Sequence, residues 1–494
     1  MITLSYESPW VVRWTVGDLH EGAWLKRQFT FTDYDDTRHK ARFGHFPERV
    51  VIDVPGQRMA HGQAIWLADA ALRDGKQVQV VDPYPRICLD TGPLPADLLP
   101  GVTLRRYQQL APQAVLLKGH GILKAGTGAG KTVMMGAIVK LLLERTPARL
   151  LVMIFSKDLL NQTARRFEAY GVPGEDIGII HSDIPADEQA EAATKRVILT
   201  THLSITKFQG TIDRTTYVLC DEAHEAMGPL WSHLLSVMPN LLNVIGFTAT
   251  PWDNDDEEHR MRAIFGRVVV DIPVRYLIDN GWLMDPDTYF LKLVYEDRDK
   301  KLVSELGWQQ AERQFILEDR NRNLLPILVL RRVGGRMLVL YDKIEHGETL
   351  RDLYEAQGVD VRLAEGKTST KDRESAIKWF EKPLEPGQRC KVLLGSKIFN
   401  QGVDLIGGCD ILFVVGATKK RRVNVQRIGR ALRLNGTGRL LIFDVWDSNH
   451  HHLTKWSGAR KKVYVDLKLK APTVVPIAEL GELLQALSEK AVVV

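Results

Sequence analysis

The sequence has few cysteines. There are four, Cys88, Cys220, Cys390 and Cys409, and no two of them form a C-x-x-C pair. Because disulfide frameworks and cysteine zinc sites need several closely placed thiols, this spacing argues against both kinds of site. Such a composition is typical of proteins that stay in a reducing cytosol.

The sequence also lacks long apolar runs and a strong excess of one charge. No run approaches the ~18 apolar residues of a transmembrane helix, and no basic-then-apolar signal opens the chain. We therefore expect a cytoplasmic protein of phage or bacterial type with no membrane partner. Lys and Arg number 66 against 61 Asp and Glu, a net charge of +5. That balance permits a nucleic-acid partner without requiring one.

A glycine-rich stretch at residues 125–132 carries the clearest chemistry, reading A-G-T-G-A-G-K-T. An apolar segment precedes it, as a strand would, and residues 133–144 follow with helical spacing. Such a loop points backbone N–H groups at a polyphosphate, and the helix N-terminus adds partial positive charge. Lys131 would reach the β- and γ-phosphates, and the Thr132 hydroxyl would bind Mg²⁺. The predicted ATP-binding loop comprises Gly126, Thr127, Gly128, Ala129, Gly130, Lys131 and Thr132.

A pair of acids supplies the other half of an ATPase. The apolar segment 217–220 runs directly into Asp221 and Glu222, followed by Ala223 and His224. Asp221 would hold Mg²⁺ through water, and Glu222 would polarise the attacking water. An Asp-Glu pair after a strand is common on surfaces, but here it follows the glycine loop within one alternating pattern. The predicted cofactors are therefore ATP and Mg²⁺.

The chain is long enough for about three domains at ~150 residues each. Apolar segments alternate with helical ones over two stretches, which is typical of parallel sheets buried on both faces. We expect an α/β fold of two parallel-sheet domains in tandem, preceded by a small α+β accessory domain. The expected boundaries are 1–98 for the accessory domain, 99–270 and 336–465 for the two sheets, 271–335 for a connecting segment and 466–494 for a C-terminal tail.

Two stretches outside the sheets leave alternatives open. Trp10, Trp14 and Trp24 could form a stacking surface for bases, so that the accessory domain binds DNA, or they could fill a small core. Near the C-terminus, three histidines at 450–452 indicate a solvated loop rather than a metal tract. Trp456 follows them, and the basic residues beside it could track phosphates. These are Lys455, Arg460, Lys461 and Lys462.

The second sheet domain has no glycine loop but carries Q-R-I-G-R-A-L-R at residues 426–433. On a helix, Arg430 and Arg433 would face the same way. A guanidinium pair delivered across a cleft can stabilise charge on a γ-phosphate, the arginine-finger role. The alternative is an amphipathic helix with a solvated basic face.

Taken in order, these motifs resemble those of superfamily 2 helicases, and the resemblance covers about residues 101–465. The D-E-A-H sequence at 221–224 resembles the DEAH box of that superfamily. The resemblance implies two RecA-like domains, the first binding ATP and the second being the helicase C-terminal domain. G-F-T-A-T-P-W at 246–252 and K-I-E-H-G at 343–347 are most similar to the XPB and phage UvsW-type DNA translocases.

The resemblance also implies roles for individual residues. Arg105 and Gln108 would bind adenine, while Gly402 and Asp404 would approach the ribose or the arginine-bearing helix. Catalytic roles fall to Lys131, Asp221, Glu222, Gln426, Arg430 and Arg433. Nucleic-acid contacts fall to Ser156, Lys157, Thr200, Thr201 and Ser396. Coupling of hydrolysis to movement falls to His224, Thr248 and Thr250. For Thr200 and Thr201 the alternative is an ordinary strand end.

The implied function is that of an ATP-dependent DNA helicase or translocase. It would remodel double-stranded, forked or branched DNA by branch migration, fork regression, unwinding or annealing, without regard to sequence. This implies roles in DNA replication, recombination or repair, with proteins of those pathways as further partners. Two alternatives stay open: an ATP-dependent RNA helicase, and an ATP-gated nucleic-acid clamp or recruitment module.

Overall fold

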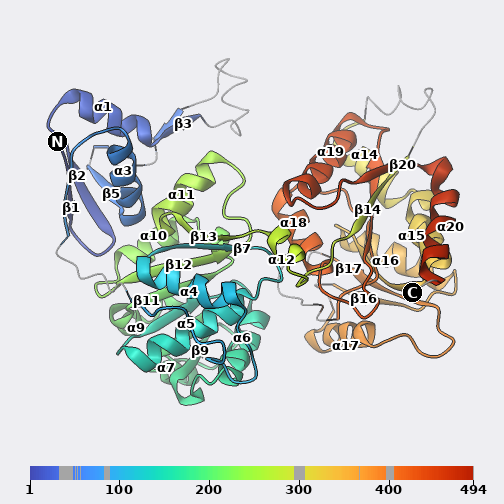
Figure 1. Cartoon of the computed structure of the whole chain (residues 1–494), viewed down its shortest axis with the longest axis horizontal. Coiled ribbons are helices and arrows are strands. Elements are labelled where there is room, and N and C mark those ends of the chain that lie inside the picture. Colours follow the sequence, from blue (N-terminus) through green and yellow to red (C-terminus); the bar gives the residue numbers. More distant parts are fainter. Residues whose placement is uncertain are drawn as a thin grey trace. The chain divides into compact units, whose positions relative to one another are not determined.

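The computed structural model describes residues 1–32, 48–50, 52, 54–55, 57–82, 89–293, 306–365, 368–396, 405 and 407–492. Within these ranges, no helix combines the length and the apolar character needed to cross a bilayer. The chain divides into two compact units (Figure 1). The first comprises Met1–Gly126 and Gly130–Ile272, and the second comprises Thr127–Ala129 and Pro273–Val494.

The first unit begins with a small α+β domain, as expected. Its four-stranded sheet has the order β5-β2-β1-β6, and β3 pairs with β4 separately. Trp14 lies in the core of this domain, and Trp10 packs into the core of the larger sheet that follows. Both indoles are buried, so the core alternative is correct for them and a base-stacking role is wrong. The elements are β1 (Ile2–Tyr6), β2 (Val11–Thr15), α1 (Leu19–Gln28), β3 (Thr30–Thr32), β4 (Glu48–Val50), β5 (Arg58–Ala60), α3 (His61–Arg73) and β6 (Val78–Val81).

This small domain is docked on the rest of the first unit through helices α3 and α11 (Asp255–Phe265). Gly62 allows the close approach, because a Cβ there would lie 1.9 Å from the Arg262 carbonyl oxygen. Beside it, Arg267 Nη1 lies 2.9 Å from Asp69 Oδ2. The small domain and the following sheet therefore form one packed body.

The larger sheet of the first unit has seven parallel strands in the order β13-β7-β12-β11-β8-β10-β9. The central strands β8, β10 and β12 are buried along their whole length, and β7 and β11 are buried at all but one residue, as a sheet covered on both faces requires. The strands are β7 (Gly121–Ala125), β8 (Leu150–Met153), β9 (Ile177–Ile180), β10 (Val197–Thr200), β11 (Tyr217–Asp221), β12 (Asn243–Thr248) and β13 (Val268–Ile272). The helices that accompany them are α4 (Arg106–Lys118), α5 (Lys131–Arg145), α6 (Lys157–Ala169), α7 (Ala186–Ala192), α8 (His202–Ile205), α9 (Gln209–Arg214) and α10 (Pro229–Ser236).

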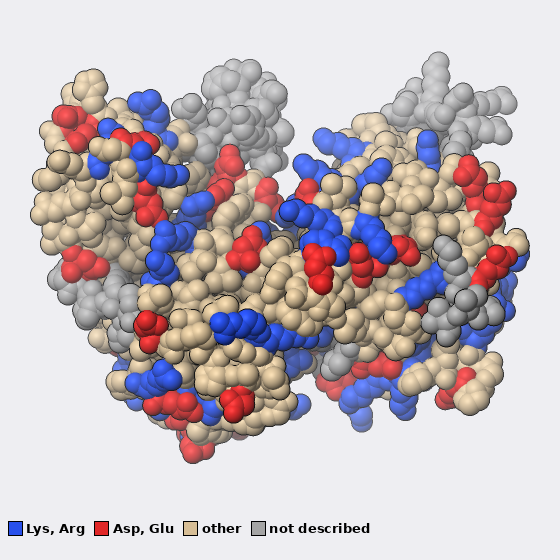
Figure 2. Space-filling view, in the orientation of Figure 1, with Lys and Arg blue, Asp and Glu red and all other residues tan. Residues whose placement is uncertain are grey.

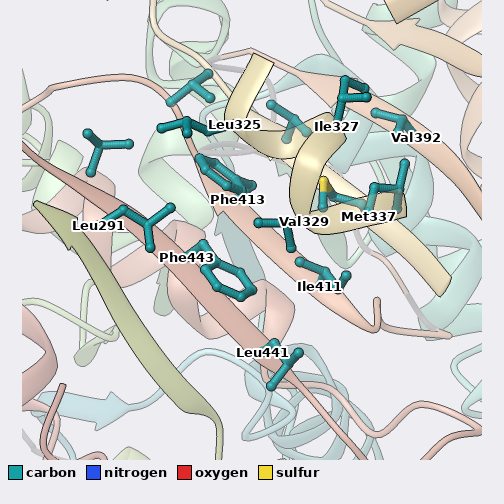
Figure 3. Packing of buried hydrophobic residues seen from close by; sticks show 14 of the residues in the cluster. Leu291, Leu325, Ile327, Val329, Met337, Val392, Ile411, Phe413, Leu441 and Phe443 are labelled. Atoms are coloured by element: carbon teal, nitrogen blue, oxygen red, sulfur yellow. The ribbon is translucent and has the colours of Figure 1, made fainter. Parts of the chain in front are cut away.

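The second unit holds a second seven-stranded parallel sheet, in the order β16-β17-β15-β18-β19-β14-β20. Figure 3 shows its apolar core, in which Leu325 and Val329 of α15 lie near Phe413 of β18. The strands are β14 (Asp287–Leu293), β15 (Gly335–Leu340), β16 (Val361–Ala364), β17 (Cys390–Gly395), β18 (Ile411–Val414), β19 (Leu441–Asp447) and β20 (Thr473–Pro476). The helices are α12 (Val274–Asp279), α14 (Trp308–Glu312), α15 (Arg320–Val333), α16 (Ile344–Glu355), α17 (Thr370–Glu381), α18 (Arg421–Ala431), α19 (His451–Asp466) and α20 (Leu480–Val492).

The second sheet reaches beyond residues 336–465. Strand β14 comes from the expected connecting segment, and β20 comes from the expected tail. Val475 and Leu484 of that tail are buried in the core of the sheet. One further expectation also needs correction, and it concerns the basic residues beside Trp456. Arg460 is fully buried against Asp444 of β19, so it does not belong to a surface basic cluster.

Candidate nucleotide and nucleic-acid sites

The glycine loop joins β7 to α5, as the sequence predicts. Gly130 is the N-cap of α5 with φ +78°, a left-handed conformation that glycine adopts without strain, and no side chain caps the helix there. The first N–H groups of a helix have no partner within the helix, so this end of α5 is suited to an anion.

Gln108 lies directly against this loop. A Cβ at Gly130 would be 2.5 Å from Gln108 Nε2, so a larger residue there would displace that amide. Gln108 is buried at the start of α4, where its Oε1 accepts a hydrogen bond from the Arg105 N–H at 3.0 Å. The start of α4 therefore brings both predicted adenine-binding residues close to the predicted phosphate loop.

The two acids lie at the same sheet edge as the loop. Asp221 ends β11, and Glu222 follows with φ +45°, a conformation uncommon for residues other than glycine. Glu222 Oε1 lies 3.7 Å from Lys131 Nζ. Only β12 separates β7 from β11, and the carboxyl ends of parallel strands are where ligands bind in such folds. The predicted lysine and catalytic acid are thus brought together.

Asp221 is held in an environment that disfavours its ionised form. Loss of hydration and the neighbouring Glu222 charge raise the pKa of Asp221 to about 6, and Lys131 opposes this only in part. A carboxylate that lacks full charge compensation gains stability from a nearby dication. The donor chemistry of Asp221, with the Thr132 hydroxyl at the start of α5, therefore fits Mg²⁺.

A line of polar contacts leads away from the acids, beginning with a close approach of Glu222 to His224 and continuing through two hydrogen bonds. His224 is buried, with Nδ1 3.4 Å from Glu222 Oε2 and 2.9 Å from the Thr248 hydroxyl. The Thr248 hydroxyl in turn accepts a hydrogen bond from the Thr250 N–H at 3.1 Å. The three predicted coupling residues thus form one continuous path from Glu222 to the end of β12.

The nucleic-acid candidates of the first unit differ in exposure. Ser156 and Lys157 begin α6, and Lys157 Nζ lies 2.6 Å from Asp183 Oδ1. Thr200 is 0% exposed, and its hydroxyl donates to the Ile180 carbonyl at 2.9 Å, so the strand-end alternative describes it better. Thr201 is half-buried. Because β8 and β10 are neighbours, Ser156 and Thr201 lie at one sheet edge.

The candidates of the second unit lie after β17 and on α18. Ser396 is buried at the end of β17, and Gln426 is buried on α18. Helix α18 ends at Ala431, so Arg433 lies beyond it and the expected shared helical face with Arg430 is wrong. Gly402 and Asp404 lie outside the described residues.

One residue of this motif was missed. Arg427 is 1% exposed, and its guanidinium donates to Asp342 Oδ1 at 2.7 Å. Asp342 follows β15 and also accepts from the Thr418 N–H at 3.1 Å. Burial raises the pKa of Asp342, but the Arg427 guanidinium outweighs that effect and leaves the pKa lowered. The pair ties α18 to the end of β15. The flanking apolar residues Val425 and Ile428 were the available sequence signal that Arg427 is buried.

Two family models match the chain over both sheets. Residues 101–253 match "Type III restriction enzyme, res subunit", and residues 319–435 match "Helicase conserved C-terminal domain". The chain belongs to the superfamily 2 helicases. Its two parallel sheets are accordingly tandem RecA-like domains, which confirms the predicted fold class.

Individual relatives of this superfamily 2 chain are distant. It is 22% identical over 344 residues to the putative DNA 3'-5' helicase Rad25 of Haloarcula marismortui, covering 69% of this chain and 52% of that protein. It is 22% identical over 365 residues to the ATP-dependent DNA helicase uvsW of Enterobacteria phage T4, covering 73% of this chain and 71% of that protein. The chain therefore spans about half the length of the first relative and seven tenths of the second.

A solved structure shows the same fold. The ATP-dependent Type ISP restriction-modification enzyme LlaBIII, solved bound to DNA, superposes with a TM-score of 0.56 at 16% identity. The match covers 80% of this chain and 33% of that one. At this identity the likeness establishes the architecture of the superfamily 2 chain and nothing about its substrate.

Proposed function

We propose that the chain is an ATP-dependent DNA helicase or translocase that remodels double-stranded, forked or branched DNA. The observation that carries the proposal is the meeting of Lys131 and Glu222, 3.7 Å apart, at the carboxyl edge of the first RecA-like sheet. A lysine at the start of a helix and an acid after a neighbouring strand are the parts that phosphoryl transfer needs. Two relatives are named as DNA helicases, which supports DNA over RNA as the substrate.

The residues present fit ATP with Mg²⁺. ATP would supply the γ-phosphate, and Mg²⁺ would supply the positive charge that neutralises it. Arg105 and Gln108 would bind the adenine, and Lys131 would hold the β- and γ-phosphates. Thr132 and Asp221 would hold the metal, Asp221 through water. Glu222 would orient the attacking water and take its proton. Backbone N–H groups of Gly126, Thr127, Gly128, Ala129 and Gly130 would complete the cradle.

The remaining site residues keep their proposed roles by resemblance. Gln426, Arg430 and Arg433 would assist hydrolysis by stabilising charge on the γ-phosphate. Ser156, Lys157, Thr201 and Ser396 would contact the nucleic-acid backbone. His224, Thr248 and Thr250 would relay the state of Glu222, and their continuous hydrogen bonds support that relay. Contacts to phosphates carry no sequence information, so binding should be largely independent of sequence.

The test is ATP hydrolysis measured with double-stranded, forked and single-stranded DNA and with RNA. Lys131→Ala should abolish turnover while the thermal unfolding profile is retained. The matched control is Lys124→Ala in the same unit, where Lys124 is exposed on β7 and paired with Asp271 at 2.8 Å. If Lys131→Ala hydrolysed ATP as fast as the control, the proposed ATP site would be wrong.

The same assay separates the two alternatives. Stimulation by RNA alone would replace the DNA helicase with an RNA helicase. Stimulation by DNA without any rearrangement of a labelled four-way junction or fork would favour an ATP-gated clamp. Strand rearrangement that requires both ATP and Glu222 supports the proposed activity, with Glu222→Gln as the non-hydrolysing variant.

A further inference from the structure

A tryptophan pair lies on the second unit, outside the residues proposed to hydrolyse ATP. Trp308 of α14 is 44% exposed, and Trp456 of α19 is half-buried. Their ring centroids are 5.8 Å apart with an interplanar angle of 62°. A large indole so exposed loses much of the free energy that its burial would contribute, so its position invites a functional reason.

The pair is held firmly by the structure beneath it. Trp456 and Leu306 pack against a buried apolar cluster that joins α14 to α19. The cluster draws residues from three segments of the chain, so it fixes α14 against α19. Its members are Ala311, Phe315, Ile316, Ala417 and Leu453. The rings are therefore a preformed surface, and binding to them requires little ordering.

Positive charge lies on the same part of the second unit as the two rings. Lys455 precedes Trp456 on α19 and is exposed, as is Lys419 in the loop before α18. Loss of hydration, the adjacent histidines and the charges of Lys419 and Lys455 lower the pKa of His452, so both lysines contribute to the positive potential at the start of α19. Figure 2 shows Lys and Arg side chains gathered on the side of the second unit where Figure 1 labels α18 and α19.

The acid on α14 does not cancel this charge. Glu312 Oε2 lies 2.8 Å from Lys343 Nζ, so its carboxylate is already paired with another lysine. The other acid on α14 and α19 is Asp466, at the end of α19. Its carboxylate lies 3.5 Å from Arg421 Nε, so it is also paired. The surface formed by Trp308, His452, Lys455, Trp456 and Lys419 (the tryptophan–lysine surface) thus combines aromatic faces with positive charge, and both acids of α14 and α19 are paired with other cations.

We propose that the tryptophan–lysine surface binds an unpaired strand of nucleic acid. A base would stack on Trp308, and Lys419 and Lys455 would contact the flanking phosphates. Aromatic faces stack on any base and lysines contact any phosphate, so this combination suits single strands without sequence preference. The inference rests on the proposed function only in taking nucleic acid as the substrate. It adds that an unpaired strand is bound and that the tryptophan–lysine surface binds it.

The experiment measures fluorescence anisotropy of a labelled 20-mer of thymidylate and of a blunt duplex, with the full chain and no ATP. Trp308→Ala should weaken binding of the single strand about 5- to 100-fold, because stacking accounts for that much per base, and should change duplex binding far less. Trp308→Phe should restore most of the affinity. The matched control is Leu328→Ala on α15, an apolar residue that is 49% exposed elsewhere on the same unit.

A lysine substitution tests whether phosphate contacts contribute to binding at the tryptophan–lysine surface. Lys455→Ala should flatten the salt dependence of single-strand binding by about 0.7 in the log–log slope, the value for one lost phosphate contact. The control is Lys371→Ala on α17, an exposed lysine outside the surface. Should Trp308→Ala prove misfolded by its thermal profile, the Lys455 slope decides alone.

The outcomes separate this inference from the proposed function. ATP hydrolysis without nucleic acid is measured for every variant and should be unchanged in Trp308→Ala. Single-strand affinity and salt slope equal to the controls would overturn the inference while leaving the ATPase intact, and would assign the surface to a protein partner instead. Absence of ATP hydrolysis in the unmodified chain would overturn the proposed function without touching the binding result.

Discussion

The substitution Asp221→Asn should stabilise the protein while abolishing ATP hydrolysis. Asp221 is ionised at pH 7 in a site that raises its pKa from 3.8 to about 6. The folded state therefore favours the protonated form, and the ionised form is penalised. The shift is about 2 units, and at 1.36 kcal/mol per unit the penalty is about 2–3 kcal/mol.

The sign of the pH dependence follows from the same shift. A raised folded-state pKa means that the penalty is absent below about pH 4 and grows as pH rises through about 6. Asparagine has no such charge and keeps an oxygen that can accept from the Glu222 N–H, as Asp221 does at 3.0 Å. The stability gap between the variant and the unmodified protein should therefore open between pH 4 and 7 and then stay constant.

The measurement is thermal unfolding across that pH range, followed for the transition of the first unit. For domains of this size 1 kcal/mol corresponds to about 2–4 °C, so the gap should reach about 4–12 °C at pH 7. Asp271→Asn, an exposed aspartate paired with Lys124, is the matched control and should shift little. Mg²⁺ with ADP should narrow the gap by stabilising the ionised Asp221. If the unfolding temperatures of Asp221→Asn and of the unmodified protein differed by the same amount at every pH, the argument would be refuted.

Three other substitutions each test one contact within a unit: the docking of the small domain, a buried ion pair and the pairing of Lys157. Gly62→Ala places a methyl 1.9 Å from a carbonyl of α11 and should cost about 1–3 kcal/mol and loosen the small domain, seen as faster proteolysis near residues 89–100. Gly210→Ala, with open space around it, is the control, and equal proteolysis of the two would contradict the docking. Arg322→Met removes the nearer of the two guanidinium partners of buried Asp447 on β19, leaving Arg460 Nη2 at 3.8 Å, and should cost about 3 kcal/mol in denaturant unfolding; a loss under 1 kcal/mol would mean that Arg460 and water compensate the carboxylate. Asp183→Asn releases Lys157, now 2.6 Å from it, and should raise oligonucleotide affinity a few-fold at low salt and not at high salt; no change at low salt would remove Lys157 from the nucleic-acid contacts.

The edges of the second sheet escaped prediction for a physical reason. Strands β14 and β20 contain polar residues because each lies toward one side of the sheet and is covered less completely than its centre. The periodicity of a buried parallel strand is a continuous apolar run, and these segments do not show one. Strand β9, at the edge of the first sheet, shows the same weak pattern, since it alternates between buried and half-buried residues.

Exposure was the hardest property to predict for single residues. Thr200 and Thr201 have the same side chain and adjacent positions, yet one is buried and one is half-buried because the strand ends between them. Arg427 and Arg430 stand in one motif, and only the first is buried against Asp342. No residue type encodes these differences. They depend on which neighbouring strand covers which side of the backbone.

The sequence by itself determined the parts whose chemistry is local. A glycine loop between a strand and a helix, an acid pair after a buried strand and an apolar rhythm of alternating elements each require only nearby residues, because backbone conformation and hydrogen bonding are set over a few positions. The predicted loop, the predicted acids and the α/β class followed from that.

Only the tertiary structure decided what those parts meet. The strand order places β12 between β7 and β11, and so brings Lys131 to Glu222 and His224 to Thr248. It also brought Trp308 to Trp456, two residues that nothing in the sequence connects. Contacts between distant segments depend on how whole elements pack to bury their apolar faces, and a local pattern carries no record of its partner.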